Sequence, residues 1–286
     1  MSLVLANIAD RDLPRIEPRL IFFDVDGTLV NAGFSVGEGT RGALHELKRR
    51  GIGAALATGR SWFAARRLAR EIAITAPSIF CSGALVVNPL NEAVLHEAAL
   101  ECTELQSLTD EAKRLGLYME LYSRDDYYIE APSHLADIHA FYTDQQAGIV
   151  SFSDLIGTRP IIKAEFMADD DTGRARMREL AAADRSLLWS FASGAGHPEV
   201  LFANVTDKRA TREAAFEAVL QATGLCRENT MAFGDSDSDI PMFKLAGQGI
   251  AMGNATPAAL AAADYVTLGV EQDGVSYALE RLSFRG

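Results

Sequence analysis

Two aspartates, Asp24 and Asp26, stand one residue apart where an apolar run meets a glycine. The run LIFF at residues 20–23 predicts a buried strand, and the pair Gly27–Thr28 predicts the turn that ends it. Two carboxylates this close repel each other, and each loses hydration beside an apolar strand. The pair therefore predicts a cation between the two side chains, and carboxylate oxygens are ligands that suit Mg²⁺.

Three further polar segments end predicted strands or open predicted helices. Thr58 and Gly59 follow the apolar run IGAALA, Lys208 precedes a helical pattern, and the stretch 234–239 follows the run TMAF. The carboxyl ends of strands in an open α/β sheet border one crevice, so the four segments predict a single site. Each signal is weak alone, because a lone Asp-x-Asp or Thr-Gly most often forms a turn or a helix cap.

The chemistry that these groups could support together is phosphoryl transfer. A carboxylate can attack phosphorus and form an acyl phosphate. Asp24, Asp26 and Asp235 offer oxygen ligands to a Mg²⁺ ion, which would offset their charge and polarise the phosphoryl oxygens. The hydroxyl and amide of the Thr-Gly pair and the ammonium group of Lys208 could hold the remaining oxygens.

Predicted strands and helices must position these catalytic groups, and they alternate along the chain as in proteins with a parallel sheet. Strand-like and helix-like runs alternate over residues 20–87 and again from about residue 205, whereas half-exposed strands between them indicate an α+β unit. We therefore predict an α/β fold with two domains. A Rossmann-like parallel-sheet core is expected from residues 1–87 and 201–286, with an inserted α+β cap domain at 88–200.

Composition narrows the class of partner. The 286 residues are 48% hydrophobic and 23% charged, which is typical of a soluble globular protein. The net charge of −12 argues against general binding to nucleic acid or to an anionic membrane. Three widely spaced cysteines and an N-terminus without a signal-like apolar segment predict a reduced, cytoplasmic protein. The expected partner is a small phosphorylated metabolite, and the oligomeric state is left open.

Taken together, the motifs DVDGTLV (24–30), ATGR (57–60), a lysine after an inserted segment and FGDSDSDIPM (233–242) resemble those of the haloacid dehalogenase (HAD) superfamily. The run IAMGNATPAALAAADYV (250–266) followed by EQDGV (271–275) resembles Cof-type phosphatases, whose type IIB α+β cap lies between the second and third motifs. The resemblance covers the core nearly end to end. Over the cap it rests only on size and on strand–helix texture.

The resemblance implies a role for each matching residue. Asp24 would be the nucleophile and a Mg²⁺ ligand. Asp26 would be the general acid and base, with its backbone carbonyl on the metal. Thr58 and Gly59 would bind the phosphoryl group, and Lys208 would pair with both that group and the nucleophile.

The fourth motif would complete the metal site. Asp235 would be a metal ligand, aided by Ser236, and Asp239 would position a metal-bound water or Lys208. Asn254 matches a polar position that lies near the phosphoryl group in such proteins.

Several positions depart from the family pattern. Ser238, one of the predicted phosphate-binding residues, replaces the usual asparagine. Its hydroxyl can donate one hydrogen bond but reaches less far than the asparagine side chain. Arg209 stands after Lys208 in place of a glycine, and Ser82 replaces a more usual asparagine. Arg60 is a candidate second contact to the substrate, although a surface helix arginine is an equally good interpretation.

We therefore predict a Mg²⁺-dependent phosphatase that hydrolyses a small phosphorylated metabolite through an aspartyl phosphate, with a sugar phosphate expected on resemblance alone. One alternative is a phosphomutase or phosphotransferase that acts on a hexose phosphate with the same core residues. Another is a receiver-like phosphorylated signalling module, which the immediate Gly-Thr after the aspartate pair and the large insertion disfavour. A third alternative is an inactive homologue that serves as a binding protein. The intact Asp24, Asp26, Lys208 and Asp235 disfavour it, because a binding protein would not need these catalytic charges.

Overall fold

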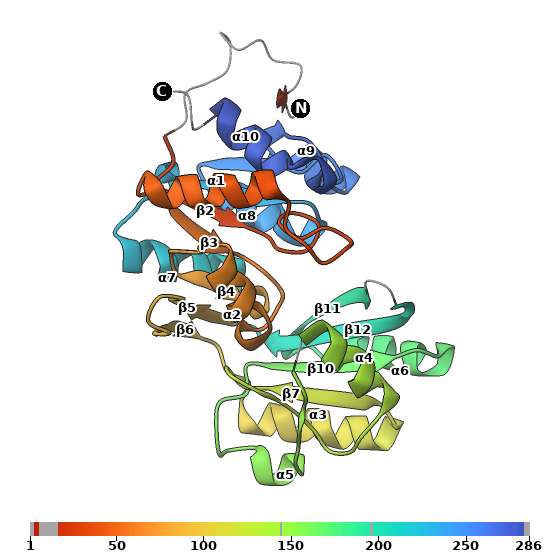
Figure 1. The fold of residues 1–286 in the computed structure, drawn as a ribbon. Coiled ribbons are helices and arrows are strands. Elements are labelled where there is room, and N and C mark those ends of the chain that lie inside the picture. Colours follow the sequence, from red (N-terminus) through yellow and green to blue (C-terminus); the bar gives the residue numbers. More distant parts are fainter. Residues whose placement is uncertain (1–2, 6–16, 144, 195–196, 283–286) are drawn as a thin grey trace. The chain divides into compact units, whose positions relative to one another are not determined.

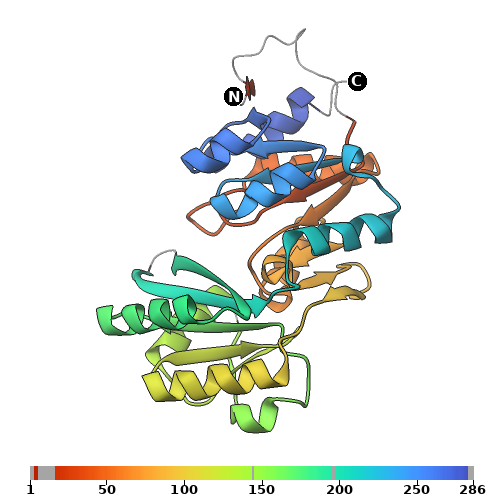
Figure 2. The same cartoon turned by 180° about the vertical axis from the view of Figure 1, so that it is seen from behind.

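The computed structural model describes residues 3–5, 17–143, 145–194 and 197–282, and the chain divides into two compact units (Figures 1 and 2). Unit 1 comprises the described residues of 1–59, 67–95 and 212–286, and unit 2 comprises those of 60–66 and 96–211. Each unit contains its own sheet. The domain boundaries at 88 and 200 remain predictions from the sequence.

In the described part of unit 1, a parallel six-stranded sheet has the order β1-β15-β14-β13-β2-β3. Its strands are β1 (Leu3–Val4), β2 (Leu20–Phe23), β3 (Gly53–Leu56), β13 (Thr230–Gly234), β14 (Gln248–Ala251) and β15 (Tyr265–Val266). All residues of β2 are buried, and Phe22 lies opposite Ala55 on one side and Ala232 on the other. A continuous apolar run becomes a central strand because both faces of a parallel sheet are covered.

Helices cover both faces of this sheet (Figures 1 and 2). The α-helices are α1 (Glu38–Arg49), α2 (Trp62–Glu71), α7 (Arg212–Thr223), α8 (Ile240–Leu245), α9 (Pro257–Ala262) and α10 (Gly274–Leu282). Short 3₁₀ helices are η4 (Arg227–Asn229), η5 (Asp237–Asp239) and η6 (Val270–Gln272), whereas η3 (Cys81–Gly83) is a turn with positive φ values. Helices α7, α8 and α9 pack on the face that contains Phe22, whereas α1 packs against α10.

A small sheet of order β4-β5-β6 continues the edge beyond β3. Its strands are β4 (Ser78–Phe80), β5 (Leu85–Val87) and β6 (Val94–Glu97). A parallel bridge between Ala57 and Ile79 joins the end of β3 to β4. The segment after β4 therefore lies next to the segment after β3.

Unit 2 contains a mixed sheet of order β11-β12-β10-β7-β8-β9. Its strands are β7 (Tyr118–Tyr122), β8 (Tyr127–Ile129), β9 (Gly148–Ile149), β10 (Lys163–Ala168), β11 (Leu187–Gly194) and β12 (His197–Asp207). Its helices are α3 (Cys102–Leu115), α4 (His134–Thr143), α5 (Phe152–Leu155) and α6 (Asp171–Ala183). Leucines of α3 and Met177 of α6 pack with Leu121 and Phe166 in one apolar core. The chain contains one unit with a parallel sheet and another with a mostly antiparallel sheet, which confirms the predicted fold class.

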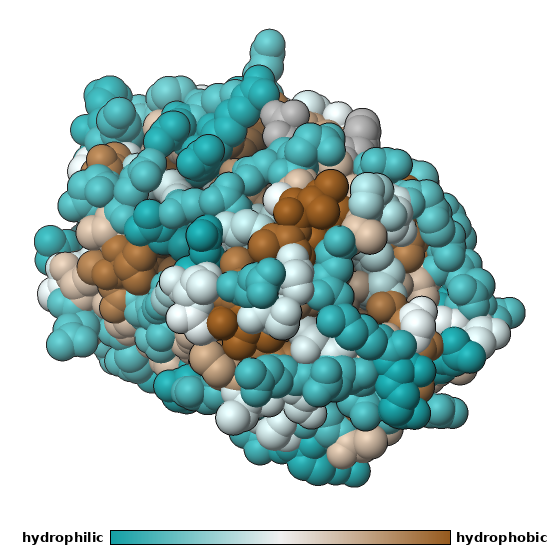
Figure 3. Space-filling model, turned by 90° about the horizontal axis from the view of Figure 1, so that it is seen from below, coloured by the Kyte–Doolittle hydropathy of each residue, from teal (hydrophilic) through white to brown (hydrophobic). Residues whose placement is uncertain are grey.

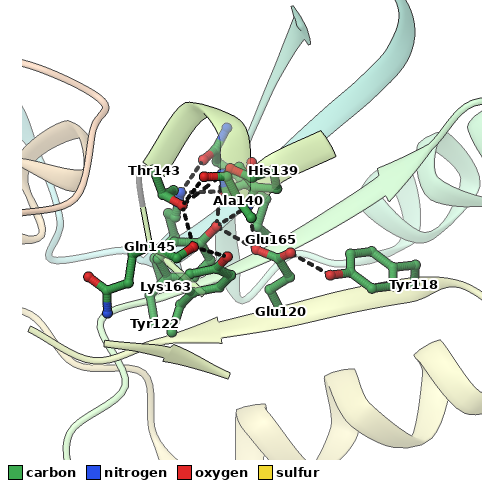
Figure 4. Close-up of polar contacts among 11 residues, drawn as sticks. Tyr118, Glu120, Tyr122, His139, Ala140, Thr143, Gln145, Lys163 and Glu165 are labelled. Atoms are coloured by element: carbon green, nitrogen blue, oxygen red, sulfur yellow. Dashed lines mark hydrogen bonds and ion pairs between the residues drawn. The ribbon is translucent and has the colours of Figure 1, made fainter. Parts of the chain in front are cut away.

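The opposite face of the second sheet contains a buried charged cluster (Figure 4). Glu120 lies directly across from Glu165 on the neighbouring strand, and like charges in such a pair repel. Lys163 pairs with Glu165, and His139 of α4 points at the sheet with its Nδ1 2.5 Å from Glu120 Oε2. The Tyr122 hydroxyl donates to the same carboxylate oxygen at 2.7 Å. With His139 protonated, two positive groups would balance the two carboxylates.

Among the described residues, no helix combines the length and apolar character that crossing a membrane requires. On the face shown in Figure 3, hydrophilic residues predominate and the hydrophobic ones gather in several separate patches.

Candidate active site

Asp24 directly follows β2 and so lies at the carboxyl-terminal end of the strands of the parallel sheet. The Asp24 amide donates to the Phe233 carbonyl at 3.0 Å, so the strand pairing continues up to this residue. The chain then turns back at Gly27, whose φ of +88° favours glycine and whose amide donates to the Val30 carbonyl at 2.9 Å. Asp26 lies exposed on this turn.

The segment after β13 forms the second part of the site. Asp239 is buried, and its Oδ2 accepts hydrogen bonds from the amides of Asp235 and Ser236 at 3.0 and 2.9 Å and from the Ser236 hydroxyl at 3.0 Å. The Ser236 hydroxyl also lies 2.8 Å from the Ser238 hydroxyl. Asp239 therefore fixes the conformation of this loop, and the role predicted for it, positioning a metal-bound water or Lys208, remains a prediction.

The two segments bring three carboxylates together. One oxygen of each of Asp24, Asp235 and Asp239 lies within 4.8 Å of the other two. Thr28 Oγ1 donates to Asp235 Oδ1 at 3.1 Å and so orients this side chain. A Cβ atom on Gly27 would lie 2.3 Å from Asp235 Oδ2, so a glycine at this position is what leaves room for the cluster.

The electrostatics of the cluster call for a positive partner. Burial raises the pKa of Asp24 well above its ordinary value, the charge of Asp239 raises it further, and Arg212 opposes both. Burial also raises the pKa of Asp235 to about 6, with the charge of Asp239 adding to the effect and the hydrogen bond from Thr28 opposing it. A divalent cation would favour the charged form of all three carboxylates, so the residues present fit such an ion.

Arg212 is the residue that the sequence analysis missed. It opens α7 and is buried at 6% exposure, and its Nη1 has no hydrogen-bond partner among the described residues. The helical pattern that directly follows Lys208 predicts a helix from residue 209, whereas α7 begins at Arg212. The signal was available, because Arg212 falls on the buried face of the helix with Ala215, Phe216 and Val219.

The Thr-Gly pair lies where the sequence predicts. Thr58 follows β3 and is buried, and its amide donates to the Ile79 carbonyl at 3.0 Å. Gly59 is exposed. Both residues therefore lie at the carboxyl edge of the sheet, beyond the strand next to β2.

Asn254 supports the first turn. Its side-chain amide donates to the Gly27 carbonyl at 2.9 Å, and its Oδ1 accepts from the Val270 amide at 2.9 Å. Both hydrogen-bonding ends of the side chain are thus engaged with the backbone, so the structure supports a positioning role for Asn254.

Two predicted site residues belong to unit 2. Lys208 is exposed and directly follows β12, and Arg60 is half-buried. Neither is part of the cluster that unit 1 forms by itself.

Comparison with known proteins agrees with this geometry. The family model described as haloacid dehalogenase-like hydrolase matches residues 21–279. Among curated proteins, the HMP-PP phosphatase of Cronobacter sakazakii is 30% identical over 85% of this chain and 87% of its own length.

Solved structures extend the likeness to the whole fold. A haloacid dehalogenase-like hydrolase from Bacteroides thetaiotaomicron has a TM-score of 0.83 and 26% identity, covering 93% of this chain and 99% of its own. The HAD subclass IIB sugar phosphatase BT4131 has a TM-score of 0.76 and 24% identity, covering 92% and 98% of the two chains.

Proposed function

We propose that this chain, a haloacid dehalogenase-like hydrolase of Cof-type, subclass IIB architecture that acts on phosphate esters, is a Mg²⁺-dependent phosphatase of a small phosphorylated metabolite. The observation that carries the proposal is the meeting of Asp24, Asp235 and Asp239 beside Arg212. In this proposal Asp24 and Asp235 hold the ion, together with the backbone carbonyl of Asp26. A bound Mg²⁺ supplies charge neutralisation and polarises the phosphoryl oxygens.

Asp24 and Asp26 have different steps in the proposed reaction. A carboxylate oxygen of Asp24 attacks phosphorus, the bond from phosphorus to the leaving oxygen breaks, and Asp26 gives its proton to that oxygen. Asp26 then takes a proton from water, which attacks the aspartyl phosphate and releases phosphate and the free carboxylate. The exposed position of Asp26 on the turn supports its role, because it must exchange protons with substrate and water.

Three groups are proposed to bind the phosphoryl oxygens. The Thr58 hydroxyl and the Gly59 amide stand at the edge of the sheet, and Arg212 adds a buried guanidinium whose charge acts on Asp24. Lys208 is the cation predicted from the sequence, and Arg212 is the candidate that the structure adds.

The substrate class rests on the relatives. One relative is named as a phosphatase of HMP-PP, and one structural neighbour is named as a sugar phosphatase. We propose a phosphorylated metabolite of that size, with a sugar phosphate as the first compound to test.

Covalent trapping tests the mechanism. An activated ester needs little protonation of its leaving group, so Asp26→Asn should form the phosphoenzyme and hydrolyse it slowly. Asp24→Asn should form none, because an amide is a poor nucleophile. The measurement is rapid quench with labelled ester, followed by mapping of the labelled residue.

Asp110→Asn, a change at an exposed residue of α3, serves as the control and should turn over like the wild type. A label on Asp26, or turnover by Asp24→Asn without any labelled protein, would overturn the assignment of the nucleophile.

A further inference from the structure

Three successive residues after β4 adopt left-handed backbone conformations. Cys81, Ser82 and Gly83 have φ values of 48°, 56° and 116°. Residues with a Cβ rarely adopt such values, and strained backbone of this kind concentrates at functional sites. The strain therefore raises the question of what this segment positions.

The strained segment borders the Thr-Gly turn. The Ser82 amide donates to the Thr58 carbonyl at 3.1 Å, and a Cβ atom on Gly59 would lie 3.5 Å from Ser82 Oγ. Helix α7, which begins at Arg212, packs against the same segment. Ser82 thus lies beside two of the groups that are proposed to hold the phosphoryl oxygens.

The Ser82 hydroxyl is available to a ligand. The residue is half-buried, and within the described ranges no side chain or backbone group forms a hydrogen bond with its Oγ. By contrast, the Ser236 hydroxyl in the same unit is engaged by both Ser238 and Asp239. A hydroxyl held at a fixed position without a partner has one donor to offer.

We propose that Ser82 is a phosphate contact, whose hydroxyl donates a hydrogen bond to a phosphoryl oxygen held at the Thr58–Gly59 turn. This inference rests on the proposed function and deepens it. The strained backbone from Cys81 to Gly83 directs the Ser82 hydroxyl toward Gly59. The steps proposed for Asp24 and Asp26 give no other reason for this orientation of the hydroxyl.

The test uses glycine substitutions, because glycine adopts the left-handed conformation without strain. Ser82→Gly removes the hydroxyl and keeps the backbone. Ala73→Gly is the matched control, since Ala73 also has a positive φ of 58° but lies between α2 and β4 and carries no polar side chain. Calorimetry measures the Kd for inorganic phosphate in the presence of Mg²⁺, and steady-state kinetics measure kcat/KM for esters with different leaving groups.

Ser82→Gly should weaken phosphate binding about tenfold and lower kcat/KM by a similar factor for every ester, because the lost hydrogen bond is to a charged group common to all. Ala73→Gly should match the wild type, and thermal unfolding should show both variants folded. An unchanged Kd, or a loss that depends on the leaving group, would overturn the assignment of Ser82. If the wild type neither binds phosphate nor hydrolyses any ester, the proposed function itself fails.

Discussion

Burial of the Arg212 guanidinium lowers the stability of the fold, but its positive charge can bind a phosphoryl oxygen. A buried guanidinium with an unpartnered Nη1 destabilises the fold, because the lost hydration is not fully replaced. We nevertheless expect Arg212→Met to lower the thermal stability of the metal-free protein, because it removes a positive charge that offsets Asp24 in the carboxylate cluster. The same change should lower kcat/KM roughly a hundredfold, as losses of single donors to a transition-state anion do.

Lys208→Met provides the comparison for that experiment. Lys208 is exposed, so its removal should change kcat/KM by no more than a few-fold if Arg212 is the phosphate-pairing cation. The opposite result, a large loss for Lys208→Met and little effect for Arg212→Met, would support Lys208, the cation predicted from the sequence. Kinetics and thermal unfolding on both variants decide between the two.

Gly27 shows how a single missing Cβ shapes the site. Gly27→Ala would place a methyl group 2.3 Å from Asp235 Oδ2 and would force a φ of +88° on alanine. Gly224→Ala forces a φ of +66° in a place with no neighbouring atom within 4 Å. Each should lose about 1–2 kcal/mol of stability from the backbone, but only Gly27→Ala should also displace the carboxylate.

We therefore expect Gly27→Ala to lose activity by at least about tenfold and to require more Mg²⁺. Gly224→Ala should keep the activity of the wild type. The measurement is kcat at a series of Mg²⁺ concentrations together with chemical denaturation. Normal Mg²⁺ dependence in Gly27→Ala would contradict the proposed geometry.

At the scale of elements, α4 is attached to its sheet through a titratable group. Burial lowers the pKa of His139, but the carboxylates of Glu165 and Glu120 raise it more, so the net shift is upward, with Lys163 opposing. A histidine with a raised folded-state pKa stabilises the fold below its unfolded pKa of about 6.5 and loses that effect as the pH rises through the folded value. Unit 2 should therefore lose stability progressively above about pH 6.5.

Trp189 lies in β11 of unit 2, so its fluorescence during denaturation measures this loss. His139→Gln should flatten the pH dependence in that range. His134→Gln should preserve it, because His134 lies on the same helix but is exposed at its pair with Asp169. If His139→Gln retained the full pH dependence, another group would have to be responsible.

Helices and strands with a clear hydrophobic pattern could be predicted from the sequence. The side chains that meet across neighbouring strands could not. The continuous apolar run LIFF forms β2 where the sequence predicts a buried strand. The helix after Lys208 was predicted to start three residues early, because a pattern of apolar residues defines the face of a helix better than its first residue. Glu120 looked like an ordinary strand residue, because its partner Glu165 and the helix that brings His139 come from distant parts of the chain.

At the scale of the whole molecule, a net charge of −12 repels an anionic substrate and favours a divalent cation at the cluster. A chelator should abolish hydrolysis, and Mg²⁺ in excess should restore it. At a concentration of 100 times its Kd, the ion should stabilise the fold by about 2.7 kcal/mol. Kinetics and thermal unfolding with and without Mg²⁺ measure both effects.

Asp235→Asn tests whether the cluster is the binding site of the ion. It relieves repulsion among Asp24, Asp235 and Asp239, so it should raise the melting temperature of the metal-free protein. The same variant should lose the stabilisation by Mg²⁺. Full turnover in chelator, or an unchanged Mg²⁺ shift in the variant, would be evidence against this site.

The position of β2 between β3 and β13 has a consequence for the growing chain on the ribosome. Thr28 is separated by 207 positions from Asp235, to which it donates a hydrogen bond, and β13 is made after all of unit 2. Residues 96–211 form one continuous stretch that can fold as soon as it emerges, whereas unit 1 must wait for its second half. The proposed nucleophile and metal site are therefore assembled last, so a chain cut short before β13 carries Asp24 and Asp26 without the carboxylates of Asp235 and Asp239.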